Sequence, residues 1–96
     1  VGLPRAKRWL YDSGTRVPLI VRIPESMRIG GQGSEGMISQ QLISSIDLGP
    51  TVLNLAGIGV PDHVQGRPFL GHHTPAPRDY VFGARDRMDE RYDIIR

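Results

Sequence analysis

The feature that most constrains the fold is a short apolar run bracketed by prolines, Val17 to Pro24, which reads VPLIVRIP. β-Branched and apolar residues are typical of a β-strand, and proline is tolerated at strand ends, where its missing N–H breaks no ladder. Apolar residues on both faces indicate burial on both faces, as in a parallel sheet covered by helices. The run therefore predicts a buried strand over residues 17–23.

A helix is predicted over residues 47–57. Asp47 is a suitable N-cap, Pro50 fits the first turn, and Gly57 is a suitable residue to end the helix. The apolar residues repeat at helical spacing and should form one packing face: Leu48, Val52 and Leu55 or Ala56.

A second strand is predicted over residues 79–85, and the final ERYDIIR favours the start of a third. Twelve glycines and eight prolines predict long loops between these elements. The order strand, loop, helix, loop, strand places the chain in the α/β class. Because the chain starts at Val1 and ends inside a strand-like run, we expect residues 1–96 to be part of a larger domain.

Positive charge gathers ahead of the first predicted strand. Five cations less the one carboxylate of Asp12 give residues 1–22 a net charge of +4, whereas the whole chain carries +2. Three interpretations compete: a solvated, ion-paired surface, a nucleic-acid surface, or a pocket for a small anion such as sulfate or phosphate. Few aromatic residues and no nucleic-acid motif argue against the second. The cations are Arg5, Lys7, Arg8, Arg16 and Arg22.

Two separated motifs resemble the sulfatase family. Lys7 followed by YDSGTRVPLI, from Tyr11 to Ile20, is similar to the family's GK-x-x-x-YEGG-x-RVP-x-I. Residues 44–70, SSIDLGPTVLNLAGIGVPDHVQGRPFL, resemble its D-(l/i)-x-PT-(l/i)-L-x-LAGI-x-x-P-x-x-x-x-G-x-S-L segment. Two motifs in the right order are more specific than either alone. The resemblance implies that residues 1–96 are a C-terminal part of a sulfatase catalytic domain with an alkaline-phosphatase-like α/β fold.

The resemblance also implies an activity, the hydrolysis of a sulfate ester or sulfamate, with a calcium ion and a formylglycine nucleophile in the complete enzyme. Lys7 matches the family's lysine that contacts the sulfate and the ester oxygen. Its ammonium group would neutralise charge that develops on the leaving oxygen. The substrate would be a sulfated small molecule or carbohydrate, and the compartment periplasmic, secreted or lysosomal.

Other family features are missing from the chain. The nucleophile motif Cys/Ser-x-Pro-x-Arg is absent, and the whole chain has no cysteine. The nearest segment, HTPAPR, has neither cysteine nor serine, and its proline and arginine are not spaced as in the motif. The motif's neighbouring aspartate metal ligands are absent too, so neither cofactor is expected to bind residues of this chain. Ser13 replaces a glycine of the pattern, which puts the backbone at this turn in doubt. We therefore predict that the chain alone is inactive and that its partner is the rest of the sulfatase domain.

A charged segment, residues 85–93, alternates in sign, which is typical of a solvated, self-paired surface. The alternative is that Arg85 or Arg87, which follow a predicted strand, meet a sugar or a second sulfate. His72 and His73 are adjacent, a poor arrangement for one metal ion, and are read as loop surface.

A nucleic-acid partner is not expected, for the reasons given above. A membrane partner is not expected either, because no apolar run approaches the roughly 20 residues of a membrane span. Two other functions stay open: a non-catalytic anion-binding module and an unrelated α/β interaction domain. The latter should bury its apolar surface, whereas a fragment should leave a core face exposed.

Overall fold

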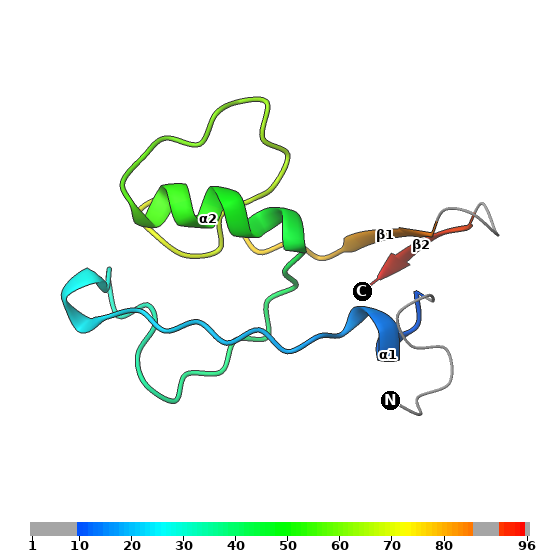
Figure 1. Ribbon diagram of the computed structural model, residues 1–96, viewed down its shortest axis with the longest axis horizontal. Helices are drawn as coiled ribbons and strands as arrows, with labels where there is room; N and C mark the ends of the chain where they lie inside the picture. The colour runs from blue at the N-terminus through cyan, green and yellow to red at the C-terminus, as the bar shows by residue number, and fades with distance from the viewer. Residues whose placement is uncertain (1–9, 86–90, 96) are drawn as a thin grey trace. The chain divides into compact units, whose positions relative to one another are not determined.

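The computed structural model describes residues 10–85 and 91–95, and for Arg85 and residues 91–95 it describes the backbone only (Figure 1). The chain divides into two compact units. The terminal unit comprises the chain up to Ile20 and from Tyr80 onward, and the central unit comprises Val21–Asp79.

The terminal unit contains a single helical turn, α1 (Asp12–Thr15). Its backbone closes through hydrogen bonds from the Gly14 and Thr15 N–H groups to the Tyr11 carbonyl, at 2.8 and 3.0 Å. Ser13 therefore has a helical backbone, which serine adopts readily, and its departure from the family's glycine causes no strain here. Arg16 lies 3.8 Å from Asp12, an exposed pair that contributes little to stability.

The terminal unit also contains a β-hairpin. β1 (Val81–Arg85) pairs antiparallel with β2 (Arg91–Ile95), in a register that runs from Val81 opposite Ile95 to Arg85 opposite Arg91. The predicted strand over residues 79–85 is confirmed from Val81, and so is the third strand. The sheet is antiparallel, because two strands joined by a short connection pair most directly in that way.

The predicted strand over residues 17–23 is wrong for this structure. These residues have no regular secondary structure, and Ile20 is 92% exposed, whereas Ile23 alone in the run is buried. A strand requires a neighbour that shares its backbone hydrogen bonds. Residues 10–85 and 91–95 supply no such neighbour, so the run lacks both its ladder and the layers that were expected to cover it.

The central unit is built around α2 (Leu48–Leu55), preceded by the 3₁₀ turn η2 (Ser45–Asp47). The helix predicted over residues 47–57 is therefore confirmed. Gly57 ends it with φ 72°, and the Ile58 N–H donates to the Leu53 carbonyl at 2.9 Å, as in a Schellman cap. A second 3₁₀ turn, η1 (Glu25–Met27), lies earlier in this unit.

The predicted packing face of α2 is also wrong for this structure. Leu48 and Val52 are 43% and 65% exposed, whereas the buried side chains are polar. Those polar residues are Asp47, Thr51 and Asn54, which lie on a different side of the helix together with the buried Pro50. Among the described side chains, Ile23 is the one buried large hydrophobic residue. The central unit is therefore organised by hydrogen bonds more than by an apolar core.

Candidate functional site

The most ordered constellation is a set of four side chains that bind the backbone of residues 67–73, and we call it the polar seam. Three of its members lie on one side of the α2 region at helical spacing, and the fourth lies in the glycine-rich loop before it. The four residues are Asp47, Thr51, Asn54 and Gln32. Every second N–H of the segment, at residues 67, 69, 71 and 73, donates to one of them.

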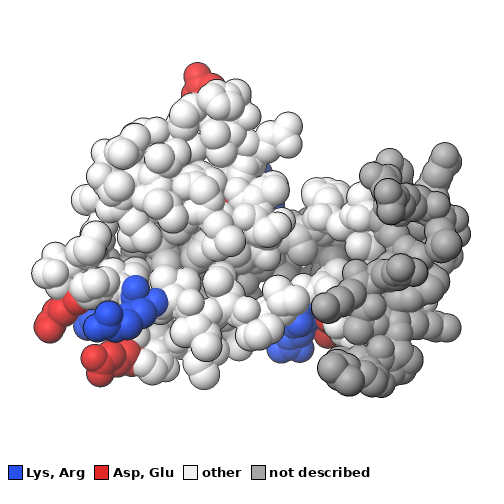
Figure 2. Space-filling model, viewed as in Figure 1, with Lys and Arg blue, Asp and Glu red and all other residues white. Residues whose placement is uncertain are grey.

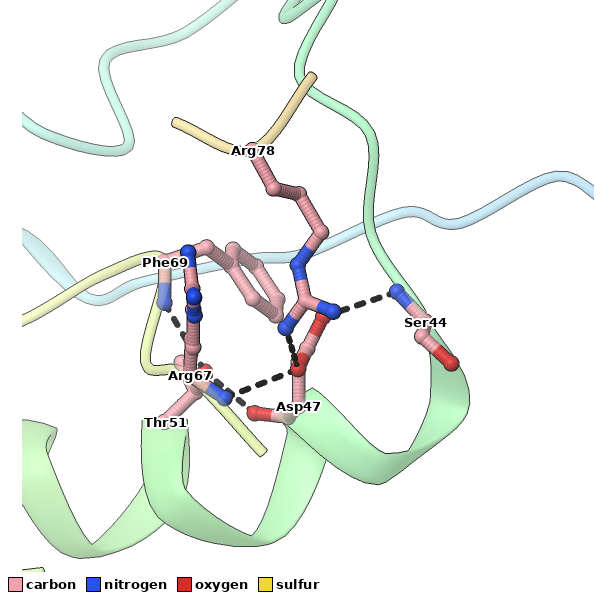
Figure 3. Close-up of polar contacts among 6 residues, drawn as sticks. All are labelled: Ser44, Asp47, Thr51, Arg67, Phe69 and Arg78. Atoms are coloured by element: carbon pink, nitrogen blue, oxygen red, sulfur yellow. Dashed lines mark hydrogen bonds and ion pairs between the residues drawn. The ribbon is translucent and has the colours of Figure 1, made fainter. Parts of the chain in front are cut away.

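Asp47 is the central residue of the polar seam and is 2% exposed. Its Oδ1 accepts from the Arg67 N–H at 2.8 Å and from Arg78 Nη2 at 2.5 Å, and its Oδ2 accepts from the Ser44 N–H at 2.8 Å (Figure 3). A buried carboxylate is tolerated when it is paired and hydrogen-bonded in this way. These contacts join three separate segments of the central unit.

Asp47 occupies the N-cap position of α2 as predicted, but its side chain does not cap α2; it belongs to the capping box of the preceding η2 turn, in which it accepts from the Ser44 N–H. Its backbone is helical, with φ −80° and ψ −14°, and its side chain makes no capping hydrogen bond to α2. An N-cap side chain reaches the first turn from an extended backbone, a geometry that the preceding η2 turn removes. The carboxylate instead turns back to Ser44 and outward to Arg67 and Arg78.

The other members of the polar seam act as backbone partners. The Phe69 N–H donates to Thr51 Oγ1 at 3.2 Å. Asn54 accepts from the His73 N–H at 3.2 Å and donates to the Leu70 and His73 carbonyls at 2.9 and 3.0 Å. Gln32 accepts from the Gly71 N–H at 2.8 Å and donates to its carbonyl at 3.3 Å. Side-chain amides thus replace the backbone partner that an extended segment otherwise needs.

Chemically, the polar seam is a positioning device and not a reaction centre. The carboxylate of Asp47 is occupied by three donors, and the amides of Asn54 and Gln32 are each hydrogen-bonded at both ends. Gly71 has φ 113°, and a Cβ there would meet the Asn54 amide at 2.6 Å. The seam therefore fixes the course of residues 67–73 closely.

Two of the sequence-predicted site residues, Lys7 and Arg87, lie outside the described residues. Arg85 is the last residue of β1, opposite Arg91, and its side chain is not described. The structure therefore does not test how these three residues lie relative to one another. On the face shown in Figure 2, basic side chains of the described residues lie beside acidic ones.

The histidines of the central unit form no metal centre with their neighbours. His72 and His73 are exposed, and His73 contributes its backbone to the polar seam. Within residues 10–85 and 91–95, no group of three His, Asp or Glu side chains could hold a metal ion. In the same part of the chain, no helix has the length and apolar character needed to cross a membrane.

Sequence reasoning missed most of the polar seam. Thr51, Asn54, Gln32 and Arg78 were not singled out, although polar residues at positions 47, 51 and 54 repeat at helical spacing and mark one side of α2. That polar repeat was present in the sequence together with the apolar one. Which of the two sides of α2 is buried depends on residues 67–73, the loop that returns to the helix.

Comparison with known proteins defines the class of the chain. Residues 5–80 match the family described as N-sulphoglucosamine sulphohydrolase, C-terminal. This match includes Lys7 and both sequence motifs, and it ends before Arg85. The chain is thus of the sulfatase class, and it belongs to the N-sulphoglucosamine sulphohydrolase C-terminal family.

Curated relatives agree with this assignment. The chain is 39% identical over 94 residues to an ulvan-active sulfatase of Formosa agariphila, covering 98% of the chain and 15% of the relative. It is 32% identical over 77 residues to an N-acetylglucosamine-6-O-sulfatase of Bacteroides thetaiotaomicron, covering 77% and 13%. It is 32% identical over 81 residues to an extracellular sulfatase SULF-1 homolog of Drosophila melanogaster, covering 81% and 7%. The chain thus spans less than a sixth of these relatives. No solved structure matches the chain significantly.

Proposed function

We propose that this chain is part of an enzyme that hydrolyses sulfate esters or sulfamates, and that it forms a C-terminal part of the catalytic domain. The observation that carries the proposal is the family match over residues 5–80, which includes both motifs in order. The substrate class is a sulfated small molecule or carbohydrate. The Bacteroides relative, whose name specifies N-acetylglucosamine, supports a carbohydrate.

Lys7 is the residue of this chain to which we assign a catalytic role. In sulfate ester hydrolysis the bond between sulfur and the ester oxygen breaks, and negative charge develops on the departing oxygen. An ammonium group held at that oxygen stabilises the charge, and its contact with the sulfate orients the reacting group. The position of Lys7 in the first motif supports the assignment.

The calcium ion and the formylglycine nucleophile do not fit the residues of this chain. The sequence has no cysteine and no Ser-x-Pro-x-Arg, and the described residues hold no cluster of metal ligands. Both groups would therefore come from the rest of the enzyme. For the compartment we propose a periplasmic, secreted or lysosomal site, in line with the Drosophila relative's designation as extracellular.

The proposed function is tested with a chimera, the Formosa sulfatase in which this chain replaces the 94-residue segment that it matches. We expect the chimera to release sulfate from ulvan, and the isolated 96-residue chain to release none, because the chain lacks a nucleophile. The matched control is the Formosa sulfatase without that segment. Turnover by the isolated chain would contradict the proposal. Sulfate binding by a chimera that folds without turnover would favour a non-catalytic anion-binding module.

Arg85, the last residue of β1, and Arg87 allow a separate test of substrate binding. Loss of a charge-assisted hydrogen bond to a second sulfate or a sugar hydroxyl should raise KM about tenfold. We therefore expect Arg85→Ala or Arg87→Ala in the chimera to raise KM for ulvan with little change in kcat. Arg67→Ala is the control, since Arg67 has an exposed side chain and contacts Asp47 through its backbone N–H. An unchanged KM in both variants would exclude the two arginines from the substrate site.

A further inference from the structure

Two sides of α2 differ in burial: one is covered by residues 67–73, and the other is largely exposed. The side formed by Asp47, Thr51 and Asn54 is buried and hydrogen-bonded to residues 67–73. The side formed by Leu48, Val52, Leu55 and Ala56 lies about 120° around the helix from it, at about 100° per residue. We call this second side the apolar stripe.

The apolar stripe has no cover within the central unit. Val52 is 65% exposed, Leu48 is 43% exposed, Ala56 is exposed and Leu55 is half-buried. Ile58, three residues after the end of α2, is also 56% exposed. A contiguous apolar face of this kind marks a contact surface more often than a solvated one.

Gly49 adds a second observation about this side of the helix. It lies within α2, next to Leu48, where glycine is a weaker helix former than alanine. A Cβ at Gly49 would meet nothing within 4 Å, and its φ is not in the left-handed region. Packing inside the central unit therefore does not explain the glycine, whereas close approach of another chain segment to α2 would.

We propose that the apolar stripe is the surface on which the remainder of the sulfatase domain packs against α2. The inference rests on the proposed function and adds the residues that make the contact. The relatives supply the candidate occupant, because the matched segment is 15% of the Formosa protein and the rest of that protein is available to cover the stripe. The polar seam occupies a different side of α2, so the remainder meets the helix through the stripe.

Val52→Asp in the chimera is the central variant. Valine and aspartate have similar helix propensities, so the substitution acts through burial of the side chain and not through the helix itself. A carboxylate forced into an apolar contact is strongly unfavourable, and we expect the soluble yield of the chimera to fall about tenfold. In the isolated 96-residue chain the same carboxylate faces solvent, and the thermal midpoint should be unchanged. Gln65→Asp, at an exposed polar position, is the matched control in both proteins.

Equal soluble yields and thermal midpoints for the Val52→Asp and Gln65→Asp chimeras would overturn the inference. So would a wild-type chimera that does not fold, since the stripe should accommodate the remainder of a relative. Size-exclusion chromatography tests the alternative that a second copy of the chain covers the stripe. If the isolated chain is a dimer that Val52→Asp dissociates, and the same substitution leaves the soluble yield of the chimera unchanged, the stripe is a contact between two copies. A folded chimera without turnover would contradict the proposed function, and the soluble yields would still decide the inference about the stripe.

Discussion

Asp47→Ala is expected to unfold the central unit. The substitution removes the acceptor for two backbone N–H groups, at Ser44 and Arg67, and leaves the mostly buried guanidinium of Arg78 without its carboxylate. Removing one partner of a buried ion pair lowers the free energy of unfolding by about 3–5 kcal/mol. Because Ile23 is the one large hydrophobic side chain buried among the described residues, no apolar core compensates for this loss.

The loss is measured by chemical denaturation and by amide hydrogen exchange at Arg67 and Phe69, whose N–H groups the polar seam protects. Asp62→Ala, at an exposed aspartate, is the control and should leave both measurements unchanged. The double variant Asp47→Ala with Arg78→Met should be more stable than Asp47→Ala alone, because it removes the unpaired charge. Equal midpoints for the Asp47 and Asp62 variants would show that the seam does not stabilise the unit.

Lys7→Ala in the chimera is expected to reduce kcat by about 10²–10³-fold, the usual cost of removing one group that stabilises a developing oxyanion. The thermal midpoint of the chimera should not change, because the proposed role is electrostatic. Steady-state kinetics on ulvan, together with thermal unfolding, separate the two effects.

Arg8→Ala removes a neighbouring cation that has no assigned position in the motif, and it is the matched control. Lys7→Arg should recover only part of the activity, since a planar guanidinium does not replace a compact ammonium group. A Lys7→Ala chimera with the kcat of the Arg8→Ala chimera would remove Lys7 from the reaction.

Local chemistry made part of the fold predictable. Gly57 and the helical spacing before it predicted α2, because helix ends are decided by backbone conformation within a few residues. The second and third strands followed from short runs of β-branched and aromatic residues. The sulfatase resemblance followed from two ordered motifs, and the family match over residues 5–80 confirms it.

Non-local contacts made the rest unpredictable. The run over residues 17–23 has the composition of a buried strand, but a strand exists only with a partner, and the described residues provide none. The side of α2 that packs was decided by residues 67–73, which lie some distance along the chain and are bound through their backbone. Asp47 was recognised as a structural residue, yet its three partners could not be read from its neighbours in the sequence.

The polar seam binds residues 67–73 through their main-chain atoms, so its hydrogen bonds do not depend on the side chains of those residues. An evolving enzyme can therefore exchange the side chains of this segment while its path stays the same. Two restrictions apply: proline is forbidden at positions 67, 69, 71 and 73, whose N–H groups are needed, and position 71 must stay glycine. A randomised library at positions 68, 70 and 72 should thus yield mostly folded proteins, which makes this segment a natural place to diversify a surface.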